Sequence, residues 1–295
     1  MTAPDDTDSE RSGAASPLAL LRRNGLEPKR SLGQNFLLDA RLSKKIADTA
    51  SANGGASVLE IGAGTGALTA PLLAAGCNVV AIETDAQLSR LLRESFAAPL
   101  ASGQLRLIEA DVREVDLLAT LDGMPAPRTL AGNLPYHLSG LLLRHAVDVA
   151  DRVVRSVFLL QLEVVDRLCA AAGSEAYGAL SVFAQAVYAP ERAFVVKRGA
   201  FYPQPNVDSA VVVLEPLPRR VELSDEFTAL VRAAFEKRRK TLRNAWRGVL
   251  GLTPDRIEAG ALAAGIDLGK RGEVLAVADF ERMALALRGG QGAPA

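Results

Sequence analysis

Short hydrophobic runs alternate with longer segments of helical spacing along the first half of the chain. The runs predict buried strands at residues 58–61, 78–82, 105–108, 129–132 and 153–160. Between and before them, apolar residues three or four positions apart predict helices at 18–26, 40–50, 68–75, 88–96, 112–121 and 139–149, the last capped by Ser139. Repeated strand–helix units predict a parallel sheet covered by helices on both faces.

The second half of the chain has a different pattern. A helical stretch runs from Gln161 to residue 188, and two β-rich runs at 192–196 and 207–214 could form an antiparallel hairpin at the sheet edge. From residue 223 onward the pattern is helical, at 227–235, 240–250, 256–264 and 274–287. Pro216-Leu217-Pro218 is the best candidate for a domain boundary. We expect a disordered polar leader at 1–16, a large domain at 17–215, a helical domain at 219–288 and a frayed tail at 289–295.

Composition limits the class of protein. The 295 residues, 49% of them hydrophobic, are enough for one large domain and a smaller one. No stretch approaches the roughly 20 apolar residues of a membrane span, and the start lacks the charged and then apolar order of a signal peptide, so we expect a cytoplasmic protein. Cys77 and Cys169 are far apart among apolar neighbours, which favours buried free thiols over a disulfide or zinc site. His137 and His145 have no partner cluster, so we expect no metal and no catalytic triad.

A glycine-rich turn and three acidic residues form the candidate cofactor site. Gly62-Ala63-Gly64-Thr65-Gly66 follows the first predicted strand and opens a helix, so a ligand can approach the backbone at Gly62 and Gly64. The third glycine comes one residue too early for the dinucleotide fingerprint. Glu60 precedes the turn, Glu83 ends the second strand, and Asp111 follows the third. Because parallel sheets bind ligands at the carboxyl ends of their strands, we expect these residues to meet.

The acids indicate a cationic nucleoside. A carboxylate at Glu83 can accept hydrogen bonds from both hydroxyls of a ribose, and Asp111 can accept one from an adenine amine. Three acids and no lysine near the loop fit S-adenosylmethionine, with its sulfonium and ammonium charges, better than a phosphate-rich ligand. The alternative for each acid taken alone is a solvated carboxylate at a strand end.

Asn133-Leu134-Pro135-Tyr136 carries groups that can hold a planar exocyclic amine for methylation. An adenine amine is a poor nucleophile because its lone pair is drawn into the ring. If the Asn133 side-chain oxygen and the next backbone carbonyl accept both amine hydrogens, the nitrogen is pushed toward a more reactive shape. An ordinary Asn-x-Pro turn is the alternative.

Reaching such an amine requires taking the base out of its stack, which costs a few kcal/mol and is offset by aromatic stacking worth about 1–3 kcal/mol per base. Tyr136 is the first candidate for stacking, and Phe201 is the second. The alternative for Phe201 is a core residue that anchors a Pro-rich loop. Leu134 and Gly132 are expected to leave room for an amine that is already methylated.

The chain resembles the small-subunit ribosomal RNA adenine N6,N6-dimethyltransferase family, known by its kasugamycin-resistance phenotype in bacteria. Six segments carry the resemblance: residues 32–37 (the N-terminal cofactor motif), 58–68 (the glycine loop), 131–139 (the target-base motif), 177–182, 201–211 and 238–244 (the basic C-terminal helix). There are two departures from the family pattern. Leu162 stands where relatives usually carry lysine, which removes one RNA contact, and His137 stands where many have asparagine.

The resemblance implies an α/β Rossmann-like methyltransferase fold with a mostly parallel twisted sheet and a small C-terminal helical domain. It implies transfer of four methyl groups from S-adenosylmethionine to two adjacent adenosines near the 3′ end of 16S rRNA, by a monomer, during assembly of the small ribosomal subunit. By position, the cofactor contacts would be Asn35, Leu37, Gly62, Glu83, Asp111 and Asn133. The target adenine would be held by Asn133, Leu134 and Tyr136.

Basic residues concentrate in one late segment, although the 34 basic and 34 acidic residues of the chain cancel. The candidate RNA contacts there are Arg232, Lys237, Arg238, Arg239, Lys240, Arg243 and Arg247, and Arg22, Arg23, Lys29 and Arg30 could extend them toward the cofactor entrance. Lys240, Arg243 and Arg247 share one face of the predicted helix at 240–250, while Phe235, Leu242 and Trp246 share another. A merely solvated face is the alternative, but beside a methyltransferase domain we expect RNA binding, which reversal of Arg239, Lys240 and Arg243 to glutamate would weaken.

Two other functions remain open at this point. A large-subunit adenine methyltransferase of the antibiotic-resistance type shares the cofactor and target-base motifs, but segment 201–211 and the helical tail favour the small-subunit enzyme. A noncatalytic nucleic-acid-binding factor on the same scaffold would not need the acids at Glu60, Glu83 and Asp111 or the amide of Asn133.

Overall fold

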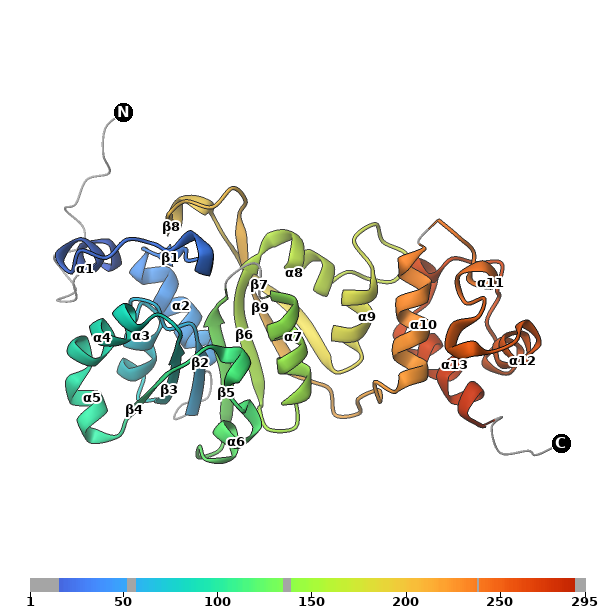
Figure 1. The fold of residues 1–295 in the computed structure, drawn as a ribbon, viewed down its shortest axis with the longest axis horizontal. Helices are drawn as coiled ribbons and strands as arrows, with labels where there is room; N and C mark the ends of the chain where they lie inside the picture. Colours follow the sequence, from blue (N-terminus) through green and yellow to red (C-terminus); the bar gives the residue numbers. More distant parts are fainter. Residues whose placement is uncertain (1–15, 52–56, 135–138, 238, 290–295) are drawn as a thin grey trace. The chain divides into compact units, whose positions relative to one another are not determined.

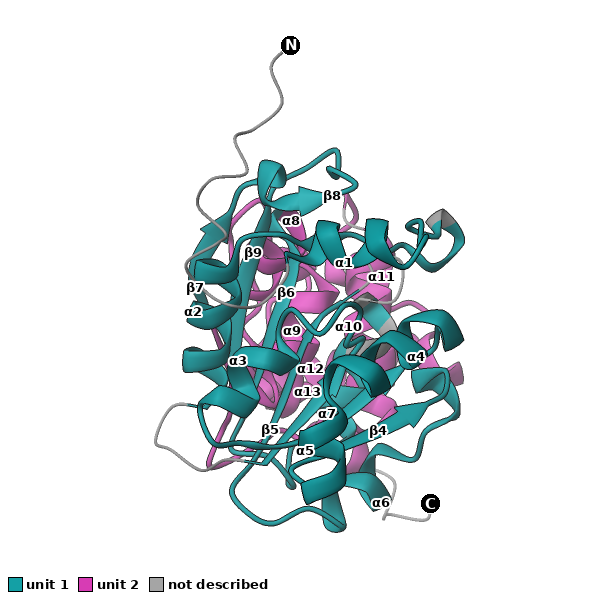
Figure 2. Ribbon diagram, turned by 90° about the vertical axis from the view of Figure 1, so that its left-hand side faces the viewer, with its two compact units in different colours: residues 1–162, 192–214 teal, residues 163–191, 215–295 magenta. Residues whose placement is uncertain are grey.

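The computed structural model describes residues 16–51, 57–134, 139–237 and 239–289. The chain divides into two compact units, residues 1–162 with 192–214 (unit 1) and residues 163–191 with 215–295 (unit 2), which are coloured separately in Figure 2. The predicted leader, up to residue 15, and the predicted tail, from residue 290, lie outside the described residues. The domain ranges 17–215 and 219–288 stay predictions.

A seven-stranded sheet organises the larger unit (Figure 1). Its strands follow the order β4-β3-β2-β5-β6-β9-β7. They are β2 (Ser57–Ile61), β3 (Asn78–Glu83), β4 (Leu105–Glu109), β5 (Arg128–Asn133), β6 (Arg155–Gln161), β7 (Tyr188–Val196) and β9 (Ser209–Pro216). Neighbouring strands from β4 to β6 are parallel, and β9 runs antiparallel to β6. The predicted strands and their mostly parallel arrangement are confirmed.

Aspartates placed before the helices explain where several of them begin. The helices of unit 1 are α1 (Pro17–Arg23), α2 (Ala40–Ala50), α3 (Thr69–Ala74), α4 (Ala86–Ser95), α5 (Ala97–Ser102), α6 (Leu117–Asp122) and α7 (Ser139–Asp148). Asp39, Asp85 and Asp116 each accept a backbone N–H in the first turn of α2, α4 and α6. The predicted helix at 112–121 is therefore wrong, because Asp116 starts a new helix after a 3-10 turn at Val112–Glu114.

The core of unit 1 lies along its parallel strands. Val58, Leu59, Ala81 and Phe158 are all fully buried, as expected for strands covered on both faces. Cys77 is a buried free thiol, as predicted, whereas Cys169 in the other unit is only partly buried. Among the described residues, no helix is long and apolar enough to cross a membrane.

A short two-stranded sheet lies apart from the main one. Strand β1 (Phe36–Leu37) pairs antiparallel with β8 (Phe201–Tyr202), so that Phe36 lies opposite Tyr202 and Leu37 lies opposite Phe201. Figure 1 shows β1 and β8 side by side, although they are far apart in the sequence. The 3-10 turns at Arg30–Leu32 and Arg198–Ala200 precede the two strands.

Unit 2 is held together by buried aromatic residues. Its helices are α8 (Leu162–Leu168), α9 (Ala179–Gln185), α10 (Asp225–Glu236), α11 (Leu242–Ala245), α12 (Pro254–Ala264) and α13 (Val277–Gly289), and 3-10 turns lie at Val249–Gly251 and Gly272–Val274. The Phe280 ring contacts the rings of Phe227, Phe235 and Trp246 at centroid distances of 6.4, 6.1 and 6.4 Å. The Trp246 indole donates to the Leu230 carbonyl at 2.9 Å, which satisfies its buried N–H.

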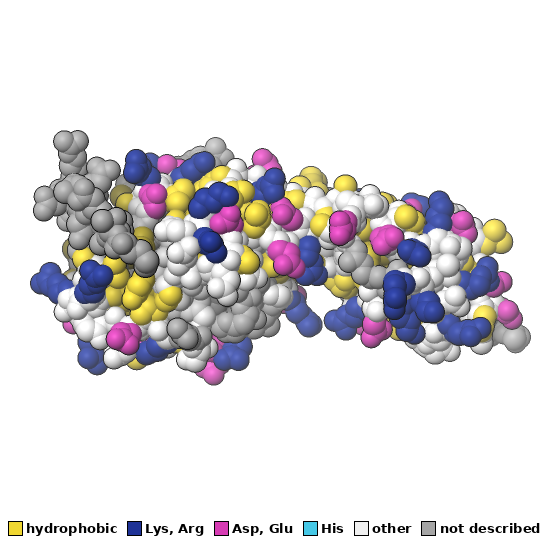
Figure 3. Space-filling model, turned by 90° about the horizontal axis from the view of Figure 1, so that it is seen from above, with side chains coloured by type: hydrophobic (Ala, Val, Ile, Leu, Met, Phe, Trp, Pro, Cys, Tyr) yellow, Lys and Arg dark blue, Asp and Glu magenta, His cyan; other side chains and the backbone are white. Residues whose placement is uncertain are grey.

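The predicted helix at 240–250 is wrong. Only Leu242–Ala245 is α-helical, because Gly248 takes a left-handed φ of 74° and Leu250 a φ of 55°. Leu242 and Trp246 are nevertheless fully buried, and the basic residues around them are exposed. In Figure 3, Lys and Arg side chains gather over the part of unit 2 that α10–α13 form.

Candidate functional site

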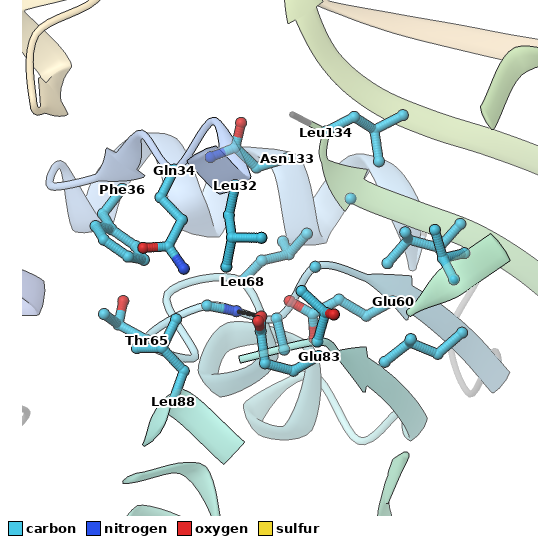
Figure 4. A pocket seen from close by; sticks show the side chains of 18 of the residues that line it. Leu32, Gln34, Phe36, Glu60, Thr65, Leu68, Glu83, Leu88, Asn133 and Leu134 are labelled. Atoms are coloured by element: carbon cyan, nitrogen blue, oxygen red, sulfur yellow. Dashed lines mark hydrogen bonds between the residues drawn. The ribbon is translucent and has the colours of Figure 1, made fainter. Parts of the chain in front are cut away.

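A cavity of about 190 Å³ opens at the carboxyl ends of β2, β3, β4 and β5 (Figure 4). Its walls come from the N-terminal segment at 31–37, the glycine loop, the ends of β3 and β4, and the end of β5. Glu83 and Asn133, which belong to different strands, both line it. The structure therefore brings the predicted acidic residues together with Asn133 and Leu134 in one cavity.

The glycine loop forms the floor of this cavity and requires its glycines. Gly62, Gly64 and Gly66 take left-handed φ angles of 75°, 58° and 82°. A Cβ added to Gly66 would lie 2.4 Å from the Phe96 ring, and one on Gly64 would lie 3.3 Å from the Phe36 ring. The N–H of Gly62 donates to the Ile82 carbonyl at 2.9 Å, which ties the loop to β3.

Glu83 is fixed from two sides by the backbone. Its two carboxylate oxygens accept the N–H of Gly64 at 2.8 Å and the N–H of Asp85 at 2.9 Å. Burial raises the pKa of this carboxyl, and the two N–H donors partly oppose that rise. The result is a carboxylate with a set orientation at the end of β3, where it faces the cavity (Figure 4).

Glu60 is a second buried acid of the cavity. Its side chain is 1% exposed and accepts the Thr69 hydroxyl at 2.7 Å. Burial raises its pKa from 4.5 to about 8, with a further rise from the charge of Glu83, while the Thr69 hydrogen bond acts in the opposite direction. Burial thus favours the protonated form of Glu60 in the protein alone, and a cation bound beside it would favour its ionised form.

Asp111 occupies the third predicted acidic position, at the cavity wall after β4. Arg113 donates to it from Nε at 3.0 Å and from Nη2 at 2.6 Å, and this pairing lowers the pKa of Asp111. Arg113 is the one basic residue among those that line the cavity, beside the acids Glu60, Glu83 and Asp111. The described lining thus has a negative balance and holds no lysine.

Asn133 ends β5 with its amide oriented by the N-terminal segment. The Asn133 Nδ2 donates to the Asn35 carbonyl at 2.9 Å, so Oδ1 remains as an acceptor. Leu134 lines the same cavity and is 1% exposed. Pro135, Tyr136 and His137 lie outside the described residues, so the predicted stacking by Tyr136 stays a prediction.

Gly132 lies where a side chain would not fit. A Cβ at Gly132 would lie 2.5 Å from the Ile61 carbonyl oxygen and 2.9 Å from Leu134 Cδ2. A glycine is required here because the end of β2 at Ile61 and the Leu134 side chain lie too close to admit a Cβ. Gly132 and Leu134 both line the cavity, and the prediction that they leave room for a methylated amine stays a prediction.

Phe201 belongs to the core, and its neighbour is the exposed aromatic residue. Phe201 is 4% exposed and packs in the cluster that contains Leu37, so a direct RNA contact does not fit its position, whereas the alternative of a core anchor does. Tyr202 is 41% exposed. Residues opposite each other in an antiparallel pair share a face, so Tyr202 lies on the same face as Phe36, which lines the cavity.

Sequence reasoning missed the roles of two residues that line the cavity, Thr65 and Gln34, and of Asp85, which Gln34 contacts. The Thr65 hydroxyl lines the cavity and is buried without a hydrogen-bond partner among the described residues. Gln34 lines it as well and donates to Asp85. Gln34 belongs to the motif at 32–37. The role of Asp85, however, depends on its contacts with Lys29 and Gln34, which are distant in the sequence and which no local pattern predicts.

The predicted RNA contacts of unit 2 form one exposed set. We call Arg232, Lys237, Arg239, Lys240, Arg243 and Arg247 the basic surface, since all six side chains are exposed. Arg243 pairs with Glu258, whereas Arg239 and Lys240 have no ion-pair partner among the described residues. Arg238 and the side chain of Arg30 lie outside what the structure describes, Arg22 and Arg23 are exposed, and Lys29 is bound to Asp85.

Comparison with known proteins places these features in a family. The sequence model described as ribosomal RNA adenine dimethylase matches residues 25–287. The chain is 42% identical over 266 residues to the ribosomal RNA small subunit methyltransferase A of Geobacter sulfurreducens, covering 88% of this chain and 95% of that protein. It is 43% identical over 284 residues to the protein of the same name from Anaeromyxobacter dehalogenans strain 2CP-C, covering 92% and 98%.

Solved structures share the fold at lower identity. A dimethyladenosine transferase from Plasmodium falciparum superposes with a TM-score of 0.68 at 23% identity, covering 84% of this chain and 96% of that one. The 23S rRNA methyltransferase ErmE superposes with a TM-score of 0.64, also at 23% identity, covering 86% and 99%. The predicted methyltransferase fold is confirmed.

Proposed function

The chain belongs to the ribosomal RNA adenine dimethylase family, and on that premise we propose that it dimethylates N6 of two adjacent adenosines near the 3′ end of 16S rRNA. The methyl donor is S-adenosylmethionine, and the reaction accompanies assembly of the small ribosomal subunit. The observation that carries the proposal is the family match over residues 25–287, which spans the glycine loop, the acids and Asn133 of one cavity. We further propose that the protein acts as a monomer in the cytoplasm.

The cavity fits S-adenosylmethionine by its chemistry. When bound, this cofactor supplies a methyl group on an electrophilic sulfonium. Glu83 would accept the ribose hydroxyls and Asp111 the adenine amine, while Gly62 and Gly64 would let the ligand lie against the backbone. Asn35 and Leu37, which also line the cavity, would complete the contacts. The buried Glu60 suits a positively charged ligand, because a cation would stabilise its ionised form.

The target adenine would meet Asn133 and Leu134. Since Asn133 Nδ2 donates to the Asn35 carbonyl, Oδ1 would accept one hydrogen of the target amine, and the Leu134 carbonyl would accept the other. Tyr136 would stack on the base. These residues orient the nitrogen lone pair, and the proton released from nitrogen leaves to water, so the protein needs no strong base.

RNA would be held at two places. On the basic surface, Arg239, Lys240 and Arg247 would contact phosphates. At the cavity, Tyr202 replaces Phe201 as the aromatic residue that would contact RNA, because it is exposed on the face it shares with Phe36.

One experiment tests the function directly. Under-methylated small subunits are incubated with the protein and labelled S-adenosylmethionine, and the modified nucleotides are mapped. We expect label on two adjacent adenosines near the 3′ end of 16S rRNA and none on large subunits treated in parallel. Label on large-subunit RNA would favour the antibiotic-resistance type of enzyme, and cofactor-independent RNA binding without label would favour a noncatalytic factor.

A further inference from the structure

The N-terminal segment at 29–37 is fastened to the cavity at two points. At one end, the Asn35 carbonyl accepts the Asn133 amide. At the other end, Lys29 and Gln34 both reach Asp85, which lies more than 50 positions further along the chain at the start of α4. Residues 31–37 of this segment line the cavity. The segment therefore forms one wall of the space that the cofactor would fill.

The contacts at Asp85 form one connected network. Its carboxylate is 4% exposed and accepts Lys29 Nζ at 2.8 Å and Gln34 Nε2 at 3.2 Å. The Lys29 N–H in turn donates to Gln34 Oε1 at 2.8 Å, which closes a loop within the segment. The backbone N–H of Asp85 donates to Glu83. Asp85 thus joins the N-terminal segment to the carboxylate that would hold the ribose.

Helix capping alone does not account for these contacts. Asp85 accepts the Gln87 N–H at 3.0 Å as the cap of α4, and Asp39 caps α2 in the same manner. Asp39, however, has no ion-pair partner among the described residues, whereas Asp85 holds a charged lysine and an amide while it is almost fully buried. Moving Lys29 and Gln34 away would leave the buried Asp85 carboxylate without these partners, which is costly. These contacts therefore keep the segment in one position.

We propose that Asp85 is a positioning residue for cofactor binding, which acts through Lys29 and Gln34 to hold residues 29–37 at the cavity and through its own N–H to orient Glu83. This inference rests on the proposed use of S-adenosylmethionine. The free protein then presents a preorganised site, and less ordering has to occur when the cofactor binds.

The test is the affinity of the free protein for S-adenosylmethionine, measured by titration calorimetry without RNA. Lys29→Met removes the ammonium and keeps the apolar stem, and Asp85→Asn keeps a helix cap while it removes the charge. We expect each to raise the cofactor Kd roughly tenfold, and the double variant to raise it by about the same factor, because both changes break one interaction. Lys29→Arg should restore binding to within about threefold.

The matched control is Lys44→Met, which breaks the exposed pair of Lys44 with Asp48 on α2 and should leave the cofactor Kd unchanged.

Amide hydrogen exchange of the cofactor-free protein supplies a second readout. Lys29→Met should speed exchange at residues 29–37 and not in β2–β5. The proposal would be overturned if Lys29→Met had the same cofactor Kd as the parent, or if Lys44→Met raised the cofactor Kd as much as Lys29→Met does. If the parent itself does not bind S-adenosylmethionine, the proposed function fails instead.

Discussion

The cavity of unit 1 and the basic surface of unit 2 hold their ionisable groups in opposite ways. In the cavity, Glu60 and Glu83 are almost fully buried, and each is fixed by hydrogen bonds from the protein. On the basic surface, Arg239 and Lys240 are exposed and have no ion-pair partner among the described residues. The cavity therefore depends on the exact position of single groups, whereas the basic surface depends on the number of its charges.

We expect the largest effect in the cavity, where activity depends on the position of single groups, when Asn133 is replaced. Asn133→Ala removes the acceptor for the target amine and should lower kcat about 100- to 1000-fold, the range seen when one preorganised donor or acceptor is removed from a transition state. The cofactor Kd, measured by calorimetry, should rise far less than kcat falls, because Glu83 and Asp111 remain although the hydrogen bond of Asn133 to the Asn35 carbonyl is lost. Near-parental kcat at saturating RNA would show that Oδ1 does not hold the amine.

The number of charges on the basic surface can be tested with a double reversal. Arg239→Glu with Lys240→Glu should weaken RNA binding roughly 10- to 30-fold at low salt and reduce the slope of log affinity against log salt by about 1–2. Arg90→Glu with Arg106→Glu, two exposed residues of unit 1, changes the net charge equally and serves as the control. If both double variants lose affinity equally, overall charge and not the basic surface governs binding.

Glu60 shows that a buried acid in the cavity also affects stability. Its pKa is raised from 4.5 to about 8, so the folded protein binds this proton more tightly than the unfolded chain does. The free energy of unfolding should therefore fall as pH rises from about 4.5 to about 8 and level off above, by roughly 1–3 kcal/mol for this group. Urea unfolding of the cofactor-free protein at pH 6 and pH 8.5 measures it, and Glu60→Gln should remove most of the difference. An unchanged pH dependence in Glu60→Gln would place the effect on other groups.

The parallel sheet and the cavity could be predicted because their signals are local. Strands such as 58–61 are continuous apolar runs, and the glycine loop and its acids follow directly after them. The break in the helix predicted at 240–250 was missed because Leu242 and Trp246 keep helical spacing, while Gly248 takes a left-handed conformation that composition does not reveal.

Other features depend on pairings between distant segments. The place of β9 beside β6, and the ion pair of Lys29 with Asp85, join residues with no shared local pattern. The roles of Phe201 and Tyr202 differ for the same reason, because the pairing of β8 with β1 decides which ring enters the core. A one-residue shift of that register would exchange the two side chains.

Tyr202 gives the smallest expected effect and the sharpest contrast within one dipeptide. Tyr202→Ala removes an exposed ring near the cavity and should weaken binding of a 16S rRNA fragment about 5- to 10-fold, at the low end of what one stacked base contributes, without a change in melting temperature. Tyr202→Phe keeps the ring and should bind within about twofold of the parent. Phe201→Leu should instead lower the unfolding free energy by about 1 kcal/mol and leave RNA affinity unchanged, because it repacks the core around Leu37. If Phe201→Leu weakens RNA binding more than Tyr202→Ala does, the assignment is reversed. The Phe201 ring would then have to leave the core to contact the RNA, and Tyr202 would not be the aromatic contact.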